Sequence, residues 1–363
     1  MSLRPNRQDR IAKARAELRI GLPVLLVDSG FAALVMAAEE VKHSDLVELH
    51  QMGLAPVLAI TSRRAETLKA RAYDGDLARI VLPKDTDAQW ILSVINPASD
   101  LEFPLKGPFN TLREGSAAMH RAALSLCKQA HLLPAALVAD LSQLQLDKLQ
   151  SGGLTRLELA ELATGEALPE IREISHARVP LLVSEQSQLR IYRPEDGGEE
   201  HYAIIIGSPD HVKAVLCRLH SACFTGDVLG SLKCDCGAQL QGAMEQIAAE
   251  GAGVLLYLNQ EGRGIGLANK MRAYSLQDQG FDTVEANHRL GFEDDERDFR
   301  IGAQILKKLG FSSVRLLTNN PAKVERMNSC GMKVVERVPL RLGKTVQNAG
   351  YLAVKAAKSG HIL

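Results

Sequence analysis

The first half of the chain alternates short apolar runs with segments whose apolar positions recur every three to four residues. The apolar runs are bounded by Gly, Pro, Asp or Ser, which is typical of buried strands; they lie at 21–29, 53–61, 77–83 and 135–141. Helical spacing predicts helices at 7–19, 33–42 and 116–132. Strands that alternate with helices indicate an α/β domain.

The second half begins with a polar segment, 154–179, whose spacing predicts a helix. Alternating apolar and polar residues around the Gly197-Gly198 turn then predict antiparallel strands within 179–207. Strand and helix patterns alternate again after that, with strands expected at 214–221, 253–259, 313–318 and 332–339 and helices at 238–251, 267–280, 298–310 and 321–331. We expect an α/β fold (α+β mixed sheets) with two domains, 1–168 and 169–363, each a mixed sheet with flanking helices.

Composition and charge limit the class of protein. A chain of 363 residues is long enough for two domains, and its 43 basic residues balance 43 acidic ones. This neutral balance provides no electrostatic basis for binding nucleic acid or a membrane surface, although a local cluster of donors can still bind a small anion. The charged N-terminus does not resemble a signal peptide, and no apolar run approaches the roughly 18–20 residues of a membrane helix, so we expect a cytoplasmic protein.

Three of the six cysteines, Cys223, Cys234 and Cys236, fall within fifteen residues. Three thiolates can occupy three corners of a zinc tetrahedron and leave the fourth to water, which is the pattern of catalytic zinc sites. The alternatives are three buried apolar cysteines or a disulfide. The neighbouring His220 is a candidate fourth ligand, which would close the site.

Two turns that follow predicted strands have the features of anion sites. In the segment 259–270, glycines at 262, 264 and 266 allow close backbone approach before a helix begins, and Arg263 adds a charged fork suited to phosphate. After the strand at 313–318, Thr318 or Asn319 is expected to cap a helix that opens with Pro321. Lys323 is unfavourable near a helix N-terminus unless an anion lies beside it.

An acidic run at 291–300 precedes a predicted helix. Its carboxylates suit a helix start, but one of them is also a candidate general base, with Arg297 as a positioned cation or nucleophile. Tyr274 is either a core residue of its helix or a proton donor to the site.

Together these segments closely resemble GTP cyclohydrolase II. The matching motifs occur in the family's order over about 172–363: "RLHSACFTGDVLGSLKCDCGAQL", "LNQEGRGIGLANKMRAYSLQDQGFDTVEANHRLGFEDDERDF", "RLLTNNPAKVE", "ERVPL" and the closing "YLAVKAAKSGHIL".

Carried over residue by residue, the resemblance implies zinc bound by Cys223, Cys234 and Cys236. It implies Asp295 as general base, Arg297 as a nucleophile toward the α-phosphorus, and Tyr274 in the ring-opening chemistry. The implied GTP contacts are Arg218, Leu219, His220, Ser221, Ala222, Gln239, Glu261, Gly262, Arg263, Thr283, Thr318 and Lys323.

The implied reaction is the first step of riboflavin biosynthesis. Pyrophosphate leaves as the nucleotide passes to Arg297 or water, zinc-activated water attacks C8 of guanine, and formate is lost. The product is 2,5-diamino-6-ribosylamino-4(3H)-pyrimidinone 5′-phosphate. The resemblance also implies a homodimer, and we expect Mg²⁺ with the triphosphate. The neutral charge balance leads us to expect no nucleic-acid or membrane partner.

Two positions depart from the family pattern, which often has Glu where this chain has Ala222 and Arg where it has Asn259. The loss of that Glu removes a hydrogen-bond acceptor near the substrate.

The first half resembles 3,4-dihydroxy-2-butanone-4-phosphate synthase in its framework but lacks its chemical groups. The lyase has acidic residues where this chain has Ser29 to Ala33, and Gly-His-Thr-Glu where it has Gly115 to Ala118. Its metal requires such groups, so we expect a degenerate domain without lyase activity. Two alternatives to a monofunctional enzyme are a bifunctional enzyme and a zinc-bearing nucleotide-binding regulator.

Overall fold

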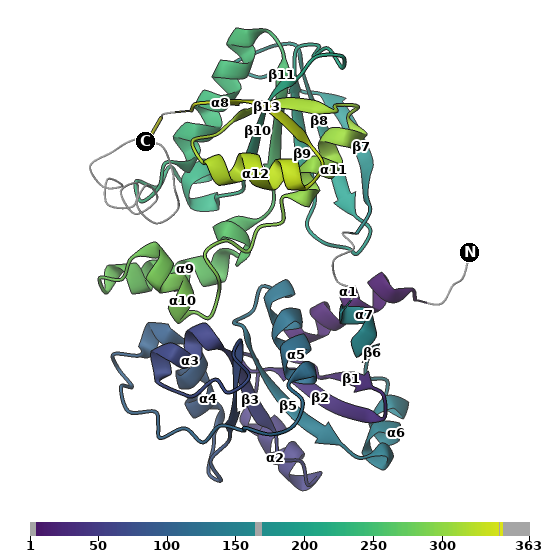
Figure 1. Ribbon diagram of the computed structural model, residues 1–363, viewed down its shortest axis with the longest axis vertical. Helices are drawn as coiled ribbons and strands as arrows, with labels where there is room; N and C mark the ends of the chain where they lie inside the picture. The colour runs from purple at the N-terminus through teal and green to yellow at the C-terminus, as the bar shows by residue number, and fades with distance from the viewer. Residues whose placement is uncertain (1–4, 164–168, 341, 344–363) are drawn as a thin grey trace. The chain divides into compact units, whose positions relative to one another are not determined.

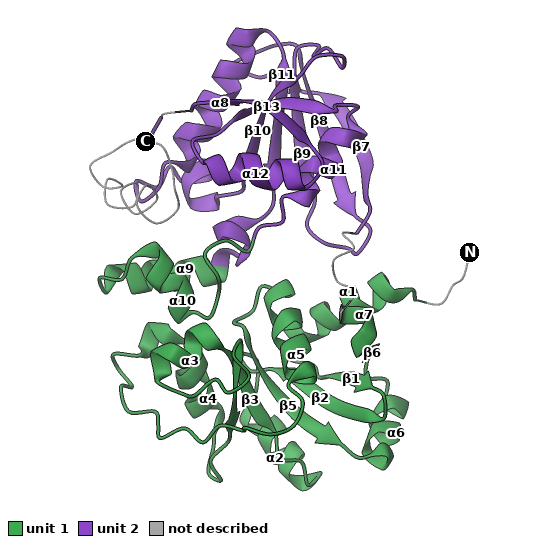
Figure 2. Ribbon diagram, viewed as in Figure 1, with its two compact units in different colours: residues 1–167, 268–296 green, residues 168–267, 297–363 purple. Residues whose placement is uncertain are grey.

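The computed structural model describes residues 5–163, 169–340, 342 and 343, so the closing motif at 351–363 and the predicted boundary at 168/169 lie wholly or partly outside the described residues. The chain forms two compact units (Figures 1 and 2). The first comprises 1–167 together with 268–296, and the second comprises 168–267 together with 297–363.

The first unit contains a mixed six-stranded sheet in the order β4-β3-β5-β2-β1-β6. Its strands are β1 (Val24–Asp28), β2 (Phe31–Ala37), β3 (Val57–Thr61), β4 (Leu77–Val81), β5 (Ala135–Leu141) and β6 (Arg156–Glu158). Only β1 and β6 pair in parallel.

The expected helix at 33–42 is wrong. Ser29 and Gly30 have positive φ angles of 40° and 92°, and they turn the chain so that β2 returns antiparallel to β1. Because β2 also pairs with β5, most of its residues are buried on both sides, and a fully buried strand has no alternation to distinguish it from a helix.

Helices surround this sheet (Figure 1). They are α1 (Arg7–Arg19), α2 (His43–Gln51), α3 (Ser62–Leu68), α4 (Ala88–Ile95), η1 (Pro97–Ser99), α5 (Ala118–Gln129), α6 (Gln143–Ser151), α7 (Leu159–Ala163), α9 (Leu267–Asp278) and α10 (Thr283–Arg289). One core cluster joins α1 and α5 to the sheet through buried residues such as Leu18, Leu126 and Val35.

The second unit contains a seven-stranded sheet in the order β13-β12-β10-β11-β9-β8-β7. Its strands are β7 (Ile171–Arg178), β8 (Ser187–Pro194), β9 (His201–Ile206), β10 (Val215–Ser221), β11 (Gly253–Leu258), β12 (Ser313–Leu317) and β13 (Lys333–Val338). The strands β13, β12, β10 and β11 are parallel, whereas β9, β8 and β7 continue the sheet antiparallel, as the Gly-Gly turn predicted.

Helices cover both faces of the parallel strands. The second unit's helices are η2 (Phe224–Val228), α8 (Cys236–Glu250), η3 (Glu261–Gly264), α11 (Arg300–Lys308) and α12 (Pro321–Ser329). Ile247 of α8 packs on one face, while Leu306 of α11 and Met327 of α12 pack on the other. Burial on both faces explains why β10, β11 and β12 are apolar runs.

The predicted helix at 154–179 is also wrong in part. The segment contains strand β6, the short helix α7 and strand β7, whose residues after Ile171 are exposed. Strand β7 lies at the edge of its sheet and pairs only with β8, so it needs few apolar residues. Its polar sequence therefore lacks the alternation of a strand and was mistaken for a helical pattern. None of the helices in the described part of the chain has the length and apolar character of a transmembrane helix.

Candidate functional site

The three clustered cysteines lie on two segments at the end of β10. Cys223 lies two residues after the end of β10, Cys234 lies two residues before α8, and Cys236 is the first residue of α8. Their sulfur atoms all lie within 4.8 Å of one another, and the Sγ atoms of Cys223 and Cys234 are 3.7 Å apart. All six cysteines are free, so the disulfide alternative is wrong.

This geometry fits a zinc ion. Thiolates held at about 2.3 Å from zinc in a tetrahedron would be about 3.8 Å apart, close to the Cys223–Cys234 separation. The adjacent Cys223 and Cys234 sulfurs hold the pKa of Cys236 well above its usual value. A divalent cation would reverse that effect, because it stabilises all three thiolates at once.

Two glycines allow the cysteine segments to approach each other. A Cβ on Gly226 would lie 2.7 Å from Cys234 Sγ and 3.1 Å from Cys223 Sγ, and a Cβ on Gly237 would lie 2.3 Å from the Gly226 carbonyl oxygen. At both positions a side chain would therefore collide with its neighbours. Glycine allows the two backbone segments to approach closely, and this approach brings the three sulfur atoms together.

We expect Gly226→Ala to abolish zinc binding, because the added methyl group would push into the sulfur cluster. The matched control is Gly230→Ala in the same loop, where φ is 65° but the space around a Cβ is open. That control costs about 1 kcal/mol of backbone strain and should keep its zinc. Metal analysis of both purified variants tests the difference, and equal zinc contents would contradict the role of Gly226 in shaping the three-cysteine site.

A carboxylate that the sequence analysis did not single out holds the cysteine loop in place. Asp227 accepts hydrogen bonds from the Cys223 N–H (2.9 Å) and the Tyr257 hydroxyl (3.0 Å). His220 Nε2 lies 3.1 Å from both Asp227 oxygens, and since a carboxylate only accepts, Nε2 carries the proton. The side chains of His220 and Asp227 are each 3% exposed.

His220 is thus committed to Asp227, and it is not part of the cysteine cluster. Burial lowers the pKa of His220, so its imidazole is neutral at neutral pH. Among the described residues, no nitrogen of His220 joins the three sulfur atoms, so the geometry does not support the alternative in which His220 closes the metal site. The ring stacks on Tyr257 at a centroid distance of 5.6 Å.

Asp227→Ala should loosen the metal loop, because it leaves buried donors of His220 and Tyr257 without their acceptor. We expect a loss of about 2 kcal/mol or more in the free energy of unfolding, measured by urea titration, together with faster zinc loss to a chelator. Asp147→Ala, on the exposed face of α6, is the control and should change neither. An unchanged chelation rate in Asp227→Ala would exclude a role in positioning Cys223.

Beside the cysteines, Arg218 on β10 is buried. Its Nη1 donates to the Leu317 carbonyl at 2.9 Å and its Nη2 to Gln239 Oε1 at 2.6 Å, while Gln239 in turn donates to Asp235. Burial lowers the pKa of Arg218 to about 10, so it remains a cation at neutral pH. Its Nε is buried without an acceptor among the described residues. This N–H group is therefore a candidate donor to a bound ligand.

Two further cations lie at the ends of the parallel strands. Arg297 Nη1 donates to Ser221 Oγ at 3.3 Å, and Lys323 Nζ lies 3.4 Å from the Leu219 carbonyl. Both cations stand over the Phe299 ring, at 5.3 and 5.9 Å from its centroid. The carboxyl ends of parallel strands are where α/β folds bind ligands.

The capping prediction for α12 needs correction. Asn320, and not Thr318 or Asn319, caps the helix by accepting the Ala322 N–H at 3.0 Å, and Pro321 occupies the first turn as expected. Thr318 is buried and accepts the Asn320 N–H at 3.0 Å.

The glycine-rich turn after β11 is tied to the metal loop. Glu261 accepts the Phe224 N–H at 2.6 Å and the Gly262 N–H at 3.0 Å. Gly262 and Arg263 both have φ angles of 62°, a left-handed conformation that is strained for arginine. Ala222 and Asn259, the two residues that differ from the family pattern, lie at the ends of β10 and β11. The Ala222 N–H donates to the Leu258 carbonyl at 2.8 Å, and the Asn259 side chain donates to the Glu200 carbonyl at 2.6 Å.

Three predicted site residues, Tyr274, Thr283 and Asp295, belong to the first unit, whereas the cysteines and Arg297 belong to the second. Tyr274 is half-buried on α9, with Lys270 Nζ 5.6 Å from its ring centroid. Thr283 opens α10 and accepts from Gln277 Nε2 at 3.2 Å. Within one unit, the structure therefore brings together the cysteines and the cations but not these three residues.

The rest of the acidic run has structural partners within the first unit. Glu293 pairs with Arg63 (2.9 Å), Asp294 with His288 (2.7 Å) and Glu296 with Lys128 (2.6 Å). For these three carboxylates the structural interpretation holds, whereas the role of Asp295 as general base stays a prediction from the family resemblance.

A three-thiol cluster beside buried cations at the carboxyl edge of a parallel sheet is the arrangement of a metalloenzyme that acts on an anionic substrate. The family of GTP cyclohydrolase II matches residues 172–339. The chain is 42% identical to GTP cyclohydrolase-2 of Azospirillum brasilense over 359 residues, which is 97% of this chain and 93% of that protein. It is 58% identical to GTP cyclohydrolase-2 of Escherichia fergusonii over 166 residues, 46% of this chain and 84% of that protein.

The chain therefore belongs to the GTP cyclohydrolase II family, which confirms the identification made from the sequence motifs. The expected mixed α/β fold is confirmed as well. A crystal structure of RibBX, a two-domain 3,4-dihydroxy-2-butanone 4-phosphate synthase from A. baumannii, is 18% identical and covers 85% of this chain and 93% of that one. Its TM-score of 0.32 is too low to support any inference about this chain.

Proposed function

We propose that this chain hydrolyses GTP to formate, pyrophosphate and 2,5-diamino-6-ribosylamino-4(3H)-pyrimidinone 5′-phosphate, the first step of riboflavin biosynthesis. The observation that carries the proposal is the convergence of three thiols within 4.8 Å at the end of β10, beside the buried Arg218. The family membership of the whole chain supports the same reaction.

Cys223, Cys234 and Cys236 would hold one zinc ion, since no fourth His, Cys, Asp or Glu joins the cluster among the described residues. Bound there with an open position, zinc would supply a hydrolytic water that ionises near neutral pH. The chain's own part is to hold the three sulfurs, through the Gly226 and Gly237 contact and the Asp227 carboxylate.

The cations at the strand ends would bind the triphosphate, which carries Mg²⁺. Arg218 offers its unsatisfied Nε, and Lys323 and Arg297 flank the Phe299 ring close by. The Glu261 to Arg263 turn would present backbone amides to a phosphate. We assign the remaining GTP contacts to Leu219, His220, Ser221, Ala222, Gln239, Thr283 and Thr318, as the family resemblance implies.

Within this assignment Arg297 takes part in displacement at the α-phosphorus. Asp295 acts as general base and Tyr274 as a proton-transfer group in ring opening. We further propose a homodimer located in the cytoplasm. Light scattering of the purified chain tests the dimer, and a monomer at the concentrations used for activity would exclude it as a requirement.

The direct test is to incubate purified chain with GTP and Mg²⁺ and to separate the products by chromatography. We expect formate, pyrophosphate and the diaminopyrimidine in equal amounts. GTP that is bound but remains intact would instead favour a nucleotide-binding regulator.

The first unit should have no lyase activity. Ser116 and Ala117 directly precede α5, and Ala118 is its first residue. None of the three side chains is a carboxylate or an imidazole, so they do not supply the metal-binding and acid-base groups that the lyase would need here. Incubation with ribulose 5-phosphate and Mg²⁺ should yield no dihydroxybutanone phosphate above a control without enzyme. Formation of that product would show that other residues have taken over the role.

A further inference from the structure

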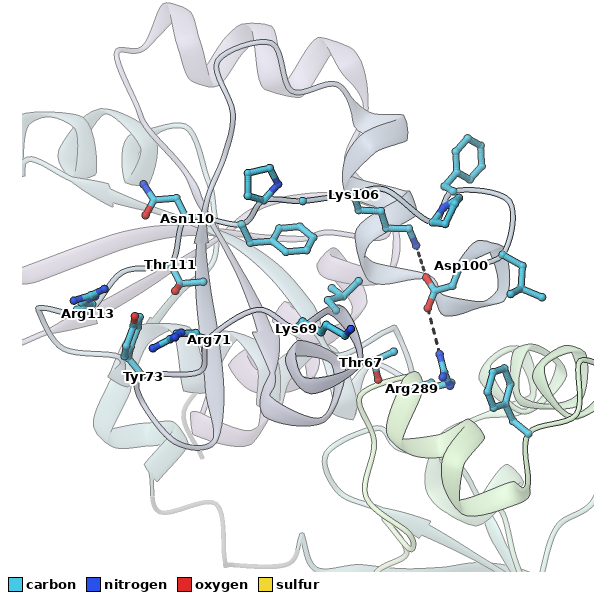
Figure 3. Close-up of a pocket in the computed structure, with 18 residues that line it drawn as sticks. Thr67, Lys69, Arg71, Tyr73, Asp100, Lys106, Asn110, Thr111, Arg113 and Arg289 are labelled. Atoms are coloured by element: carbon cyan, nitrogen blue, oxygen red, sulfur yellow. Dashed lines mark hydrogen bonds and ion pairs between the residues drawn. The ribbon is translucent and has the colours of Figure 1, made fainter.

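The first unit contains a pocket of about 760 Å³ that the proposed reaction does not use. It is formed by the end of α3 and the loop after it, by the segment 100–113, and by residues of α10 and the loop before it (Figure 3). All of these segments lie within the first unit.

The pocket carries an excess of positive charge. Five cations line it, against a single carboxylate, Asp100; the cations are Lys69, Arg71, Lys106, Arg113 and Arg289. The resemblance of the second half to its family does not predict a cation cluster in the first unit.

Three cations surround Asp100, so their positive charge exceeds the single negative charge of its carboxylate. The buried Arg64 donates two hydrogen bonds of 2.6 and 2.7 Å to Asp100, Lys106 makes an ion pair with it, and Arg289 Nη1 lies 3.8 Å away. The side chains of Arg64 and Lys106 are only 2% and 5% exposed. Holding three cations around one carboxylate in a partly buried place is unfavourable unless an anion joins them.

A second group of cations lies at the opposite end of the pocket. Figure 3 shows Arg71, Tyr73 and Arg113 at that end, Lys106, Asp100 and Arg289 at the other, and Lys69 between them. Among the described residues, Lys69 and Arg71 make no ion pair, and the Arg113 guanidinium stands over the Tyr73 ring at 4.8 Å. Such unpaired, accessible cations are typical of phosphate sites.

Apolar surface lines the same pocket. Phe103 is 44% exposed and Leu101 is 70% exposed, and Phe109 also contributes to the wall. Exposed aromatic faces beside a cation cluster suit a ligand that combines an anionic group with a planar ring. Inorganic phosphate alone would leave this apolar wall without a function.

The lining of this pocket does not include the two segments in which the sequence comparison expected the lyase groups. Neither the segment 29–33 nor the segment 115–118, where lyase groups would have been, contributes to its lining.

We propose that this pocket of the first unit binds a phosphate monoester that carries a planar ring, such as a nucleotide. The cations would hold the phosphate, and Phe103 and Phe109 would contact the ring. Because all of its residues belong to the first unit, the site is distinct from the cysteine cluster, and the proposal does not depend on the reaction proposed above.

Flavin mononucleotide and riboflavin are suitable probes because they share the ring and differ in the phosphate. Binding to the full-length chain is followed by flavin fluorescence anisotropy. We expect flavin mononucleotide to bind about tenfold or more tightly than riboflavin, since hydrogen bonds to charged groups are each worth about that factor. Inorganic phosphate at high concentration should compete with it.

Arg71→Gln and Lys69→Gln should each weaken flavin mononucleotide by about tenfold while leaving riboflavin nearly unchanged. Both positions are exposed, so the fold should be kept, and circular dichroism checks this. The matched control is Arg19→Gln, an exposed arginine at the end of α1, which should have no effect. GTP turnover should be unaffected in all three variants.

The single tryptophan of the chain provides an independent readout. The Trp90 ring centroid lies 6.2 Å from that of Phe109, which lines the pocket, so a flavin bound there should quench its emission. Equal affinities for the two flavins, or flavin mononucleotide binding that survives Arg71→Gln and Lys69→Gln and leaves Trp90 emission unchanged, would overturn the proposal.

Discussion

A Cys234→Ser variant is expected to lose its zinc and to stop releasing formate, while keeping part of its pyrophosphate release. A serine hydroxyl stays protonated at neutral pH and is a poor zinc ligand, so only two thiolates would remain. Zinc content should fall from about one ion per chain toward zero. Formate release should fall about a thousandfold or more, because without a metal the pKa of water stays far above neutral and little hydroxide is available.

The control for this variant is Cys330→Ser. Cys330 is a free, half-buried cysteine at the end of α12, outside the cluster. It should retain zinc and both products. Normal formate release by a zinc-free Cys234→Ser enzyme would separate the cysteine cluster from the chemistry.

Arg297→Ala should suppress pyrophosphate release and, with it, every later product. The guanidinium lies over the Phe299 ring and donates to Ser221, which is the last residue of β10 and lies two residues before Cys223. Removing a group that stabilises charge at the reacting phosphorus typically costs about 10²–10³-fold in rate. The measurement is pyrophosphate and formate quantified together in the same reaction.

Arg300→Ala is the matched control for Arg297→Ala, because Arg300 is an exposed arginine three residues further on that pairs with Asp298. It should have nearly the parent rate. If Arg297→Ala also released both products at nearly that rate, Arg297 would be a structural residue at the start of α11.

The metal cluster could be predicted from the sequence because its three ligands lie within fifteen residues. Spacing alone brought Cys223, Cys234 and Cys236 together as a zinc candidate, and the structure places their sulfurs close enough. The carboxylate that orders the loop, Asp227, gave no such signal. Its partner Tyr257 lies 30 positions away, and only the pairing of β10 with β11 brings the two side chains together.

Long-range contacts account for most of what the sequence could not predict. The segment 268–296 joins the first unit through contacts such as that of Asn269 with the His131 carbonyl, 138 positions away. Glu293 and Glu296 resemble active-site acids in sequence, yet they pair with Arg63 and Lys128. The hairpin of β1 and β2 was missed for a local reason, because a strand buried on both sides has no alternation.

The pocket of the first unit illustrates the same limit. Its cations come from three separate segments that share no motif, and one of them, Arg289, lies outside residues 1–168, so the sequence pattern did not indicate a site. Residues 1–168 were interpreted as a degenerate domain only because they lack the chemical groups of the lyase. A unit that lacks one chemistry can still bind a ligand through residues that the lost reaction never required.

The central claim is that the three-cysteine enzyme removes C8 of guanine as formate. GTP labelled with carbon-13 at C8, incubated with the full-length chain and Mg²⁺ and followed by carbon-13 NMR, tests this directly. We predict that the guanine C8 signal disappears as a formate signal of equal intensity grows, in step with pyrophosphate. Label that remains in a nucleotide, with or without pyrophosphate release, would contradict the claim.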